Sequence, residues 1–112
     1  MANSRMKDFY DLFILSKIFS FDGNTLVKAI KATFERRGTQ IPEDKPLALT
    51  DEFANDVDKN IQWNAFINRN NLEDIDFPQL IKALRDFLLE PVQAAAVGKT
   101  FKSKWAKNKR WE

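Results

Sequence analysis

Apolar residues recur three and four positions apart along most of the chain, the spacing that places them on one side of an α-helix. The first such stretch predicts a helix that begins with Asn3 or Ser4 as its N-cap and ends near Phe19. Beyond its first two turns this stretch is apolar on nearly every side. We therefore expect this helix to be buried in the middle of the domain.

A second helix is predicted over about residues 25–37, after a break at Gly23. Either Asp22 or Asn24 can cap it, because short polar side chains accept hydrogen bonds from the free N–H groups of a first turn. Gly38 follows two arginines, which is typical of the C-terminal end of a helix.

A third helix is expected after the segment TQIPEDKPLAL, whose two prolines predict a loop, with Thr50 as the N-cap. The pattern places a single apolar stripe on this helix, formed by Phe53, Val57 and Ile61 and widened by Trp63, Phe66 and Ile67. The whole stretch up to the next connection, NRNNLEDID, is thus predicted as one helix.

A fourth helix is predicted after Asp76, its expected N-cap, with Pro78 tolerated in the first turn. Pro91 is expected to kink or end this helix, because proline has no N–H to donate and its ring clashes with the preceding turn; helix can then resume up to Gly98. The predicted fold is all-α, a compact bundle of four or five helices with a basic, aromatic C-terminal tail. The apolar stripe of the fourth helix consists of Leu80, Ile81, Leu84, Phe87 and Leu88.

Composition limits the chemistry that such a fold can carry. At 112 residues the chain is one small domain, and it contains no cysteine and no histidine. Disulfides, thiolate metal sites and histidine acid–base catalysis are therefore excluded, and the remaining ligands suit Mg²⁺ rather than zinc. No apolar run reaches the roughly 20 residues of a membrane span, and the N-terminus lacks the apolar region of a signal peptide. A cytoplasmic protein without a membrane partner is expected.

Charge divides the chain into a helical domain, residues 1–98, and a tail, residues 99–112. The domain carries 12 basic and 15 acidic residues, a net charge of −3, whereas the tail carries 6 and 1, a net charge of +5. In the tail, KTFKSKWAKNKRWE, cations alternate with aromatic rings, a composition that can follow a nucleic-acid backbone and stack bases. On this interpretation the contact residues are Lys102, Lys104, Trp105, Lys107, Lys109 and Arg110.

The tail also has a purely structural interpretation. Phe101, Trp105 and Trp111 can pack back onto the bundle as a strap while the lysines face water. Nucleic-acid binding is expected to weaken steeply with salt, so salt dependence separates the two interpretations.

The segment SRMKDFYDL gathers charged side chains near the N-terminus. Because successive helical residues rotate by about 100°, Lys7, Asp8 and Asp11 fall within one sector of about 100°. The next turn of that sector is apolar, so the charges lie at the rim of a buried surface. Either this is an ordinary surface ion pair between Lys7 and Asp11, or it is part of a site.

SRMKDFYDL resembles the R-x-K-D-x-x-D-L segment of the AbiEii/AbiGii-type nucleotidyltransferase toxins, the toxin half of type IV toxin–antitoxin and abortive-infection systems. Three further stretches are similar, in the same order, to the helical C-terminal half of that family. The resemblance covers nearly the whole chain, and it implies the helical domain of such a toxin. The three stretches are FDGNTLVKAIKATFERRGT, LTDEFANDVDKNIQWNAFI and DFPQLIKALRDFLLEPV.

This resemblance implies a reaction and roles for four residues. Members of the family transfer nucleoside monophosphates from an NTP to an acceptor, with Mg²⁺ holding phosphates and activating the attacking hydroxyl. Lys7, Asp8 and Asp11 match the catalytic positions of the motif: the lysine meets phosphate charge, and one aspartate orients the acceptor or a phosphate-contacting partner. Arg5 matches the arginine that opens the motif and implies a nucleotide or phosphate contact.

The chain departs from the family's pattern in one respect. The metal-binding D-x-D of such enzymes follows a G-S or G-G turn on a strand, and here the two D-x-D strings, residues 56–58 and 74–76, follow no such turn. The resemblance thus implies that this chain lacks the Mg²⁺-binding catalytic domain, is inactive alone and holds no cofactor by itself, while Mg²⁺ and NTP belong to the complete enzyme. The implied partners are the missing N-terminal catalytic half, a cognate antitoxin, or RNA such as a tRNA-like acceptor. The alternative function is a non-catalytic module that binds RNA or a protein partner.

Overall fold

The computed structural model of the chain describes residues 2–38, 40–41, 49–72, 75–106 and 110–112. Within these residues the chain forms five helices and one small antiparallel sheet, which confirms the expected all-α class. The helices are α1 (Ala2–Ile18), α2 (Gly23–Arg37), α3 (Asp51–Ala54), α4 (Val57–Asn70) and α5 (Phe77–Val97). The strands are β1 (Phe21–Asp22) and β2 (Lys104–Trp105). None of the described helices is long and apolar enough to cross a membrane.

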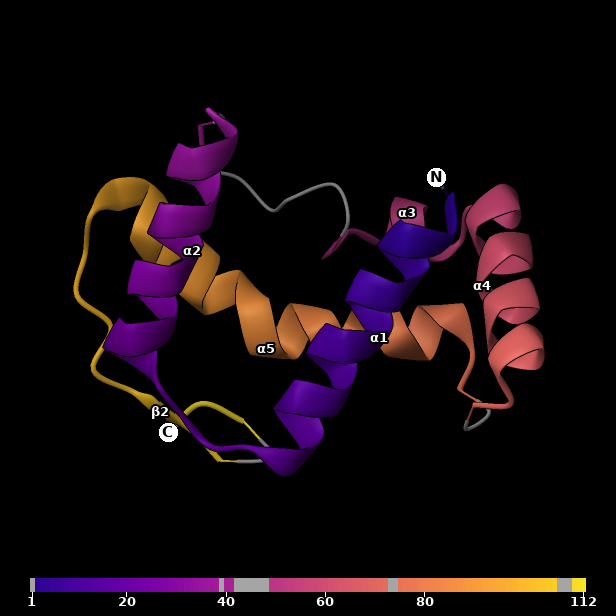
Figure 1. Cartoon of the computed structure of the whole chain (residues 1–112). Helices are drawn as coiled ribbons and strands as arrows, with labels where there is room; N and C mark the ends of the chain where they lie inside the picture. Colours follow the sequence, from indigo (N-terminus) through magenta and orange to yellow (C-terminus); the bar gives the residue numbers. More distant parts are fainter. Residues whose placement is uncertain (1, 39, 42–48, 73–74, 107–109) are drawn as a thin grey trace.

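Helix α5 is the central element of the fold, and the other four helices all pack against it. Figure 1 shows α5 running across the molecule, with α2 near one end, α4 at the other end and α1 between them. Its sequence is apolar on several sides, which allows neighbours to cover it from several directions. Five of its side chains are at most 1% exposed: Phe77, Leu80, Ile81, Leu84 and Phe87.

Helix α1 is buried on one side rather than all round. Met6 and Phe13 belong to the core, with 1% and 8% of their surfaces exposed. Leu15, Ile18 and Phe19 are exposed, so the expectation that this helix is buried on every side is wrong. The reason is that α4 and α5 meet α1 and leave its opposite side uncovered.

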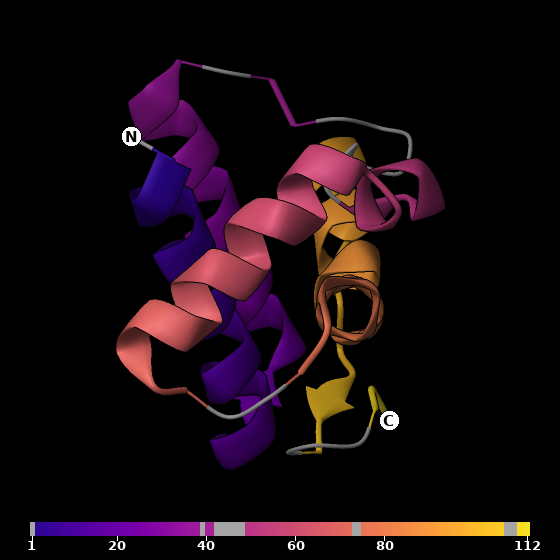
Figure 2. The same cartoon turned by 90° about the vertical axis from the view of Figure 1, so that its right-hand side faces the viewer.

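The contact between α1 and α4 is aromatic. Figure 2 shows α4 crossing in front of α1, with α5 viewed end-on beside them. The Tyr10 ring lies 6.5 Å from the Trp63 ring and 6.2 Å from the Phe66 ring, between centroids. The Trp63 indole N–H donates to the carbonyl of Ile75, 2.7 Å away, and so ties the segment before α5 to the core.

Three helix caps lie where the sequence predicts them, whereas the predicted cap of the first helix, Asn3 or Ser4, is wrong because α1 already begins at Ala2. The Asp22 carboxylate accepts from the backbone N–H of Thr25, and Asn24 is therefore not the cap of α2. The Thr50 hydroxyl and the Asp76 carboxylate likewise accept from the third residue of α3 and α5. Gly38 ends α2 with φ 63°, a left-handed conformation that favours glycine.

The predicted third helix is wrong as a single element. The chain breaks after Ala54, and the Asp56 carboxylate caps a new helix, α4, by accepting from the N–H of Lys59 at 2.9 Å. The break turns α4 relative to α3, so that Val57 and Ile61 are 71% and 62% exposed and do not continue the stripe that begins at Phe53. The other members of the predicted stripe, Trp63, Phe66 and Ile67, are buried as expected.

Pro91 was expected to kink or end the last helix, and the second alternative is wrong, since α5 continues through it to Val97, with Gly98 as the cap at the expected limit. A proline at this position leaves the carbonyl of Phe87, four residues earlier, without its helical donor. The indole N–H of Trp111 donates to that carbonyl at 2.9 Å. A side chain from the C-terminal segment thus supplies the hydrogen bond that the proline cannot.

The C-terminal segment, residues 99–112, is here called the strap, and its described residues pack onto the helices. Strand β2 pairs with β1, and the N–H of Gly23 donates to the carbonyl of Ser103 at 2.8 Å. A Cβ added at Gly23 would lie 2.5 Å from the carbonyl oxygen of Phe101, so only glycine permits this close approach. The Trp105 indole N–H donates to the carbonyl of Ser16 near the end of α1, at 2.8 Å.

Candidate functional site

The first turns of α1 place the three charged residues of the motif in solvent. Lys7, Asp8 and Asp11 are exposed, whereas Met6, one position earlier, is buried in the core. The buried side of α1 therefore fixes the direction in which the charged side points. This is the single charged sector that the helical spacing predicts.

Lys7 and Asp11 form an ion pair along the helix, with the Lys7 Nζ 2.7 Å from the Asp11 Oδ2. Their side chains are 68% and 49% exposed, so water screens this pair strongly. The hydrogen bond from Lys7 to Asp11, and then the negative charge of Asp11, raise the pKa of Lys7 above its ordinary value of 10.5, and Asp8 adds to the rise. Lys7 is therefore fully protonated at neutral pH and carries a positive charge on the exposed side of α1.

Arg5 lies on α1 one turn before Asp8, and its side chain is outside what the structure describes. The sequence places it in the same first turns, and no contact of its guanidinium enters the site geometry.

The side chains at the start of α1 do not fit a metal site of their own. Among the residues that the structure describes, no group of three or more carboxylates gathers where it could hold a metal ion. The Lys7 ammonium also lies 2.7 Å from Asp11, where it repels a second cation.

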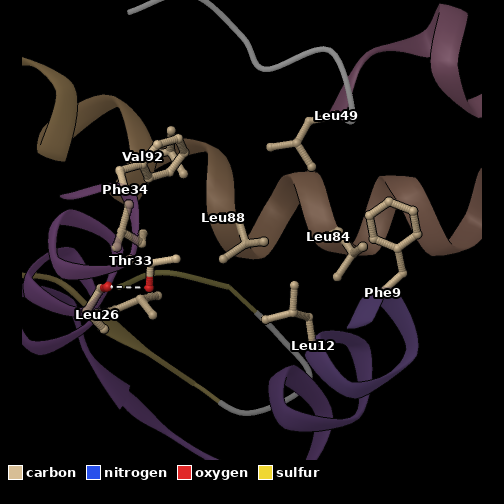
Figure 3. Close-up of a pocket in the computed structure, with 11 residues that line it drawn as sticks. Phe9, Leu12, Leu26, Thr33, Phe34, Leu49, Leu84, Leu88 and Val92 are labelled. Atoms are coloured by element: carbon tan, nitrogen blue, oxygen red, sulfur yellow. Dashed lines mark hydrogen bonds between the residues drawn. The ribbon is translucent and has the colours of Figure 1, made fainter. Parts of the chain in front are cut away.

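An apolar groove lies beside the charged sector, between α1 and α2 and over α5. It has a volume of 380 Å³, and Figure 3 shows side chains from all three helices converging on it. The hydroxyl of Thr33, a polar group in its wall, donates to the carbonyl of Ala29 within α2 at 2.9 Å. The groove is lined by Phe9, Leu12, Leu26, Ala29, Ile30, Thr33, Phe34, Leu49, Leu84, Leu88 and Val92.

The groove lacks the partners that a nucleotide requires. A triphosphate or a base needs cations and hydrogen-bond donors, and the groove offers hydrocarbon. The charged sector on α1 and the apolar groove are thus two separate features that share one helix. The groove has no signal in the sequence, because its walls come from helices that are distant along the chain and only the fold brings them together.

The strap residues divide into buried rings and exposed cations. Trp105 is 3% exposed, and Trp111 lies against Phe87 with parallel rings, so both indoles are packed in the fold. This is the packing that the strap interpretation predicts, and it leaves Trp105 without an open ring face for a base. Lys102, Lys104 and Arg110 are exposed, and Lys107 and Lys109 lie outside the described residues.

Among the described residues, the exposed start of α1 brings together one lysine and two carboxylates, and no group of metal ligands gathers there. Comparison with known proteins names the class: the family described as nucleotidyl transferase AbiEii toxin, type IV TA system, matches residues 1–101 of the 112. The chain belongs to this family of nucleotidyltransferase toxins, and a toxin–antitoxin family implies an antitoxin partner. No curated protein and no solved structure matches the chain.

Proposed function

We propose that this chain is the helical domain of an AbiEii-type nucleotidyltransferase toxin and supplies one wall of the NTP and acceptor site. The observation that carries the proposal is the exposed, paired Lys7 beside Asp8 on the first turns of α1. A protonated ammonium on an exposed helix face can form charge-assisted hydrogen bonds to phosphate oxygens.

The two aspartates are proposed to have different roles. Asp11 accepts the hydrogen bond from Lys7 and thereby positions the ammonium. Asp8, on the same exposed sector, is the carboxylate that orients the acceptor hydroxyl. Arg5 is proposed as a further phosphate contact, on the strength of its position in the family's motif.

The Mg²⁺ and the catalytic D-x-D are proposed to come from another part of the enzyme. The two D-x-D strings of this chain supply helix caps: the Asp56 carboxylate caps α4 and the Asp76 carboxylate caps α5. Both carboxylates therefore already serve the fold. The metal-binding half is the proposed partner of this chain, and a tRNA-like RNA is the proposed acceptor.

Reconstitution of nucleotide transfer tests this function. The chain is incubated with Mg²⁺ and each labelled NTP, alone and together with a separately produced D-x-D-bearing domain of the family. We expect no transfer by the chain alone, and transfer by the mixture that falls about 100-fold when Lys7 is changed to Ala, since an oriented cation is worth a few kcal/mol at a transition state. Lys31→Ala, an exposed lysine on α2, is the matched control.

Two outcomes would count against the proposal. Turnover by the chain alone would show that it contains a complete active site. Full activity of the Lys7→Ala mixture would show that the start of α1 is not part of the site.

A second candidate function is nucleic-acid contact through the exposed cations of the strap. It is supported by Lys102 and Lys104, which the packed rings fix on one segment while their side chains face solvent. We expect weak binding of a labelled single-stranded RNA, with an affinity that falls steeply as the salt concentration rises. Each lysine replaced by alanine should reduce the slope of log affinity against log salt concentration by about one unit. Lys28→Ala and Lys31→Ala are the controls. An RNA affinity that does not change with salt concentration would rule this function out.

A further inference from the structure

The exposed apolar residues at the start of α4 form a feature that the proposed nucleotide site does not use. Val57 and Ile61 are 71% and 62% exposed and lie four residues apart, so they stand on the same face of the helix. We call this pair the α4 ridge. The residues directly before and after Val57, Asp56 and Asp58, are exposed and acidic, and the half-buried Lys59 follows them.

The apolar groove between α1 and α2 has the complementary character. It is about 12 Å long from Leu26 to Phe34, at 1.5 Å per helical residue, and the two ridge residues span about half of that. Glu35, Arg36 and Arg37 follow the lining residue Phe34 in the last turn of α2, and together they carry a net charge of +1. On the α1 side the lining residue Phe9 is preceded in the sequence by Asp8, which is exposed and acidic.

From this complementarity we propose that the groove of one copy of the chain receives the α4 ridge of a second copy. Val57 and Ile61 would enter the groove, and their acidic neighbours would lie on the arginine side of it, away from Asp8. The inference goes beyond the nucleotidyltransferase function and does not depend on it.

The α4 ridge and the apolar groove lie on different parts of the chain, and this determines how copies of the chain can assemble. The ridge is at the α4 end of the molecule, whereas the groove lies between α1 and α2. A contact between unlike surfaces is head-to-tail, and it adds copies one after another unless the geometry closes a ring. The contact area is small, so association is expected at high protein concentration.

Sedimentation of the folded chain over a range of concentrations up to about 1 mM tests the proposal, because small interfaces associate weakly. The average mass should rise above the monomer value of 13.0 kDa as concentration increases. It should return toward 13.0 kDa when salt is raised to about 0.5 M, which screens the charges at the rim.

Two variants address the two surfaces without disturbing the core, since both positions are exposed. Ala29→Glu places a bulky negative charge in the groove, and Ile61→Gln removes the apolar tip of the ridge. Each alone should weaken association at least 10-fold. The controls are Ala32→Glu, which lies on α2 away from the groove, and Val97→Gln, an exposed apolar residue elsewhere.

Mixing the two variants gives the decisive result. The Ala29→Glu chain keeps a working ridge and the Ile61→Gln chain keeps a working groove, so the mixture should form a pair that does not grow further. A wild-type chain that stays monomeric at every concentration would overturn the proposal. So would self-association that survives in either variant, or a mixture that fails to pair.

Discussion

Lys7 owes its position to Asp11, one turn further along α1. The 2.7 Å hydrogen bond between them and the charge of Asp11 raise the pKa of Lys7, and the more distant Asp8 contributes least to the rise. Because folding raises this pKa, the contribution of the pair to stability is present below the unfolded value of 10.5 and is lost as pH rises through the folded value. The motif lysine is therefore charged wherever the protein functions near neutral pH.

The pKa of Lys7 should respond more to one aspartate than to the other. NMR titration of the lysine side-chain nitrogen should place the midpoint above 10.5 in the wild-type chain. Asp11→Asn should lower that midpoint more than Asp8→Asn does, because Asp11 supplies both the hydrogen bond and the larger charge effect. Equal shifts in the two variants, or a midpoint unmoved by Asp11→Asn, would show that the pair does not hold in solution.

At the scale of the elements, indole N–H groups tie segments of the fold together. Trp63, Trp105 and Trp111 donate to backbone carbonyls of Ile75, Ser16 and Phe87, which come from three different parts of the chain. The bond from Trp111 matters most for α5, because it reaches the carbonyl that Pro91 leaves without a helical donor. The strap and the proline thus form one structural unit.

A double-mutant cycle tests this coupling by urea denaturation. Trp111→Phe removes the indole donor and should lower the free energy of unfolding by about 1–3 kcal/mol. In a Pro91→Ala background the same change should lower it by about 1 kcal/mol less, because the alanine N–H can now donate to Phe87. Trp63→Phe with Pro91→Ala is the control pair and should be additive, since Trp63 donates to Ile75. Additive effects for Trp111 and Pro91 would contradict the coupling.

Local signals in the sequence predicted the elements better than their breaks. The caps at Asp22, Thr50 and Asp76 depend on residues within three positions, so the sequence alone could identify them. The break before Asp56 could not be seen in the apolar pattern, because the apolar residues keep their helical spacing across it. An aspartate at that position is nevertheless a cap signal. The hydrogen bond that replaces the one lost at Pro91 could not be predicted, because its donor, Trp111, lies twenty residues further along the chain.

In the candidate site, too, the sequence predicts the local features and not those that depend on distant segments. The charged sector of Lys7, Asp8 and Asp11 follows from helical spacing, and the structure confirms the ion pair within it. The burial of Trp105 depends on how the strap meets α1, and the apolar groove depends on three helices at once. Features of this kind arise only when distant segments are brought together, and no local pattern encodes them.

At the scale of the whole molecule, α5 holds α1 so that its motif side faces solvent, and the strap fastens the far end of α1. The family match over residues 1–101 covers all five helices and stops within the strap. The charged start of α1 and the apolar groove are chemically different surfaces of the same molecule. We propose above all that a nucleoside triphosphate binds this protein at the start of α1.

Chemical-shift mapping with Mg·ATP and the other three NTPs tests that claim most directly. We expect the largest amide shifts at Lys7, Asp8 and their neighbours in the first turns of α1, with saturation only at about millimolar NTP because a single wall binds weakly. These shifts should disappear in Lys7→Ala and persist in Lys31→Ala. Shifts that concentrate on the groove or the strap, or that survive in Lys7→Ala, would contradict the account.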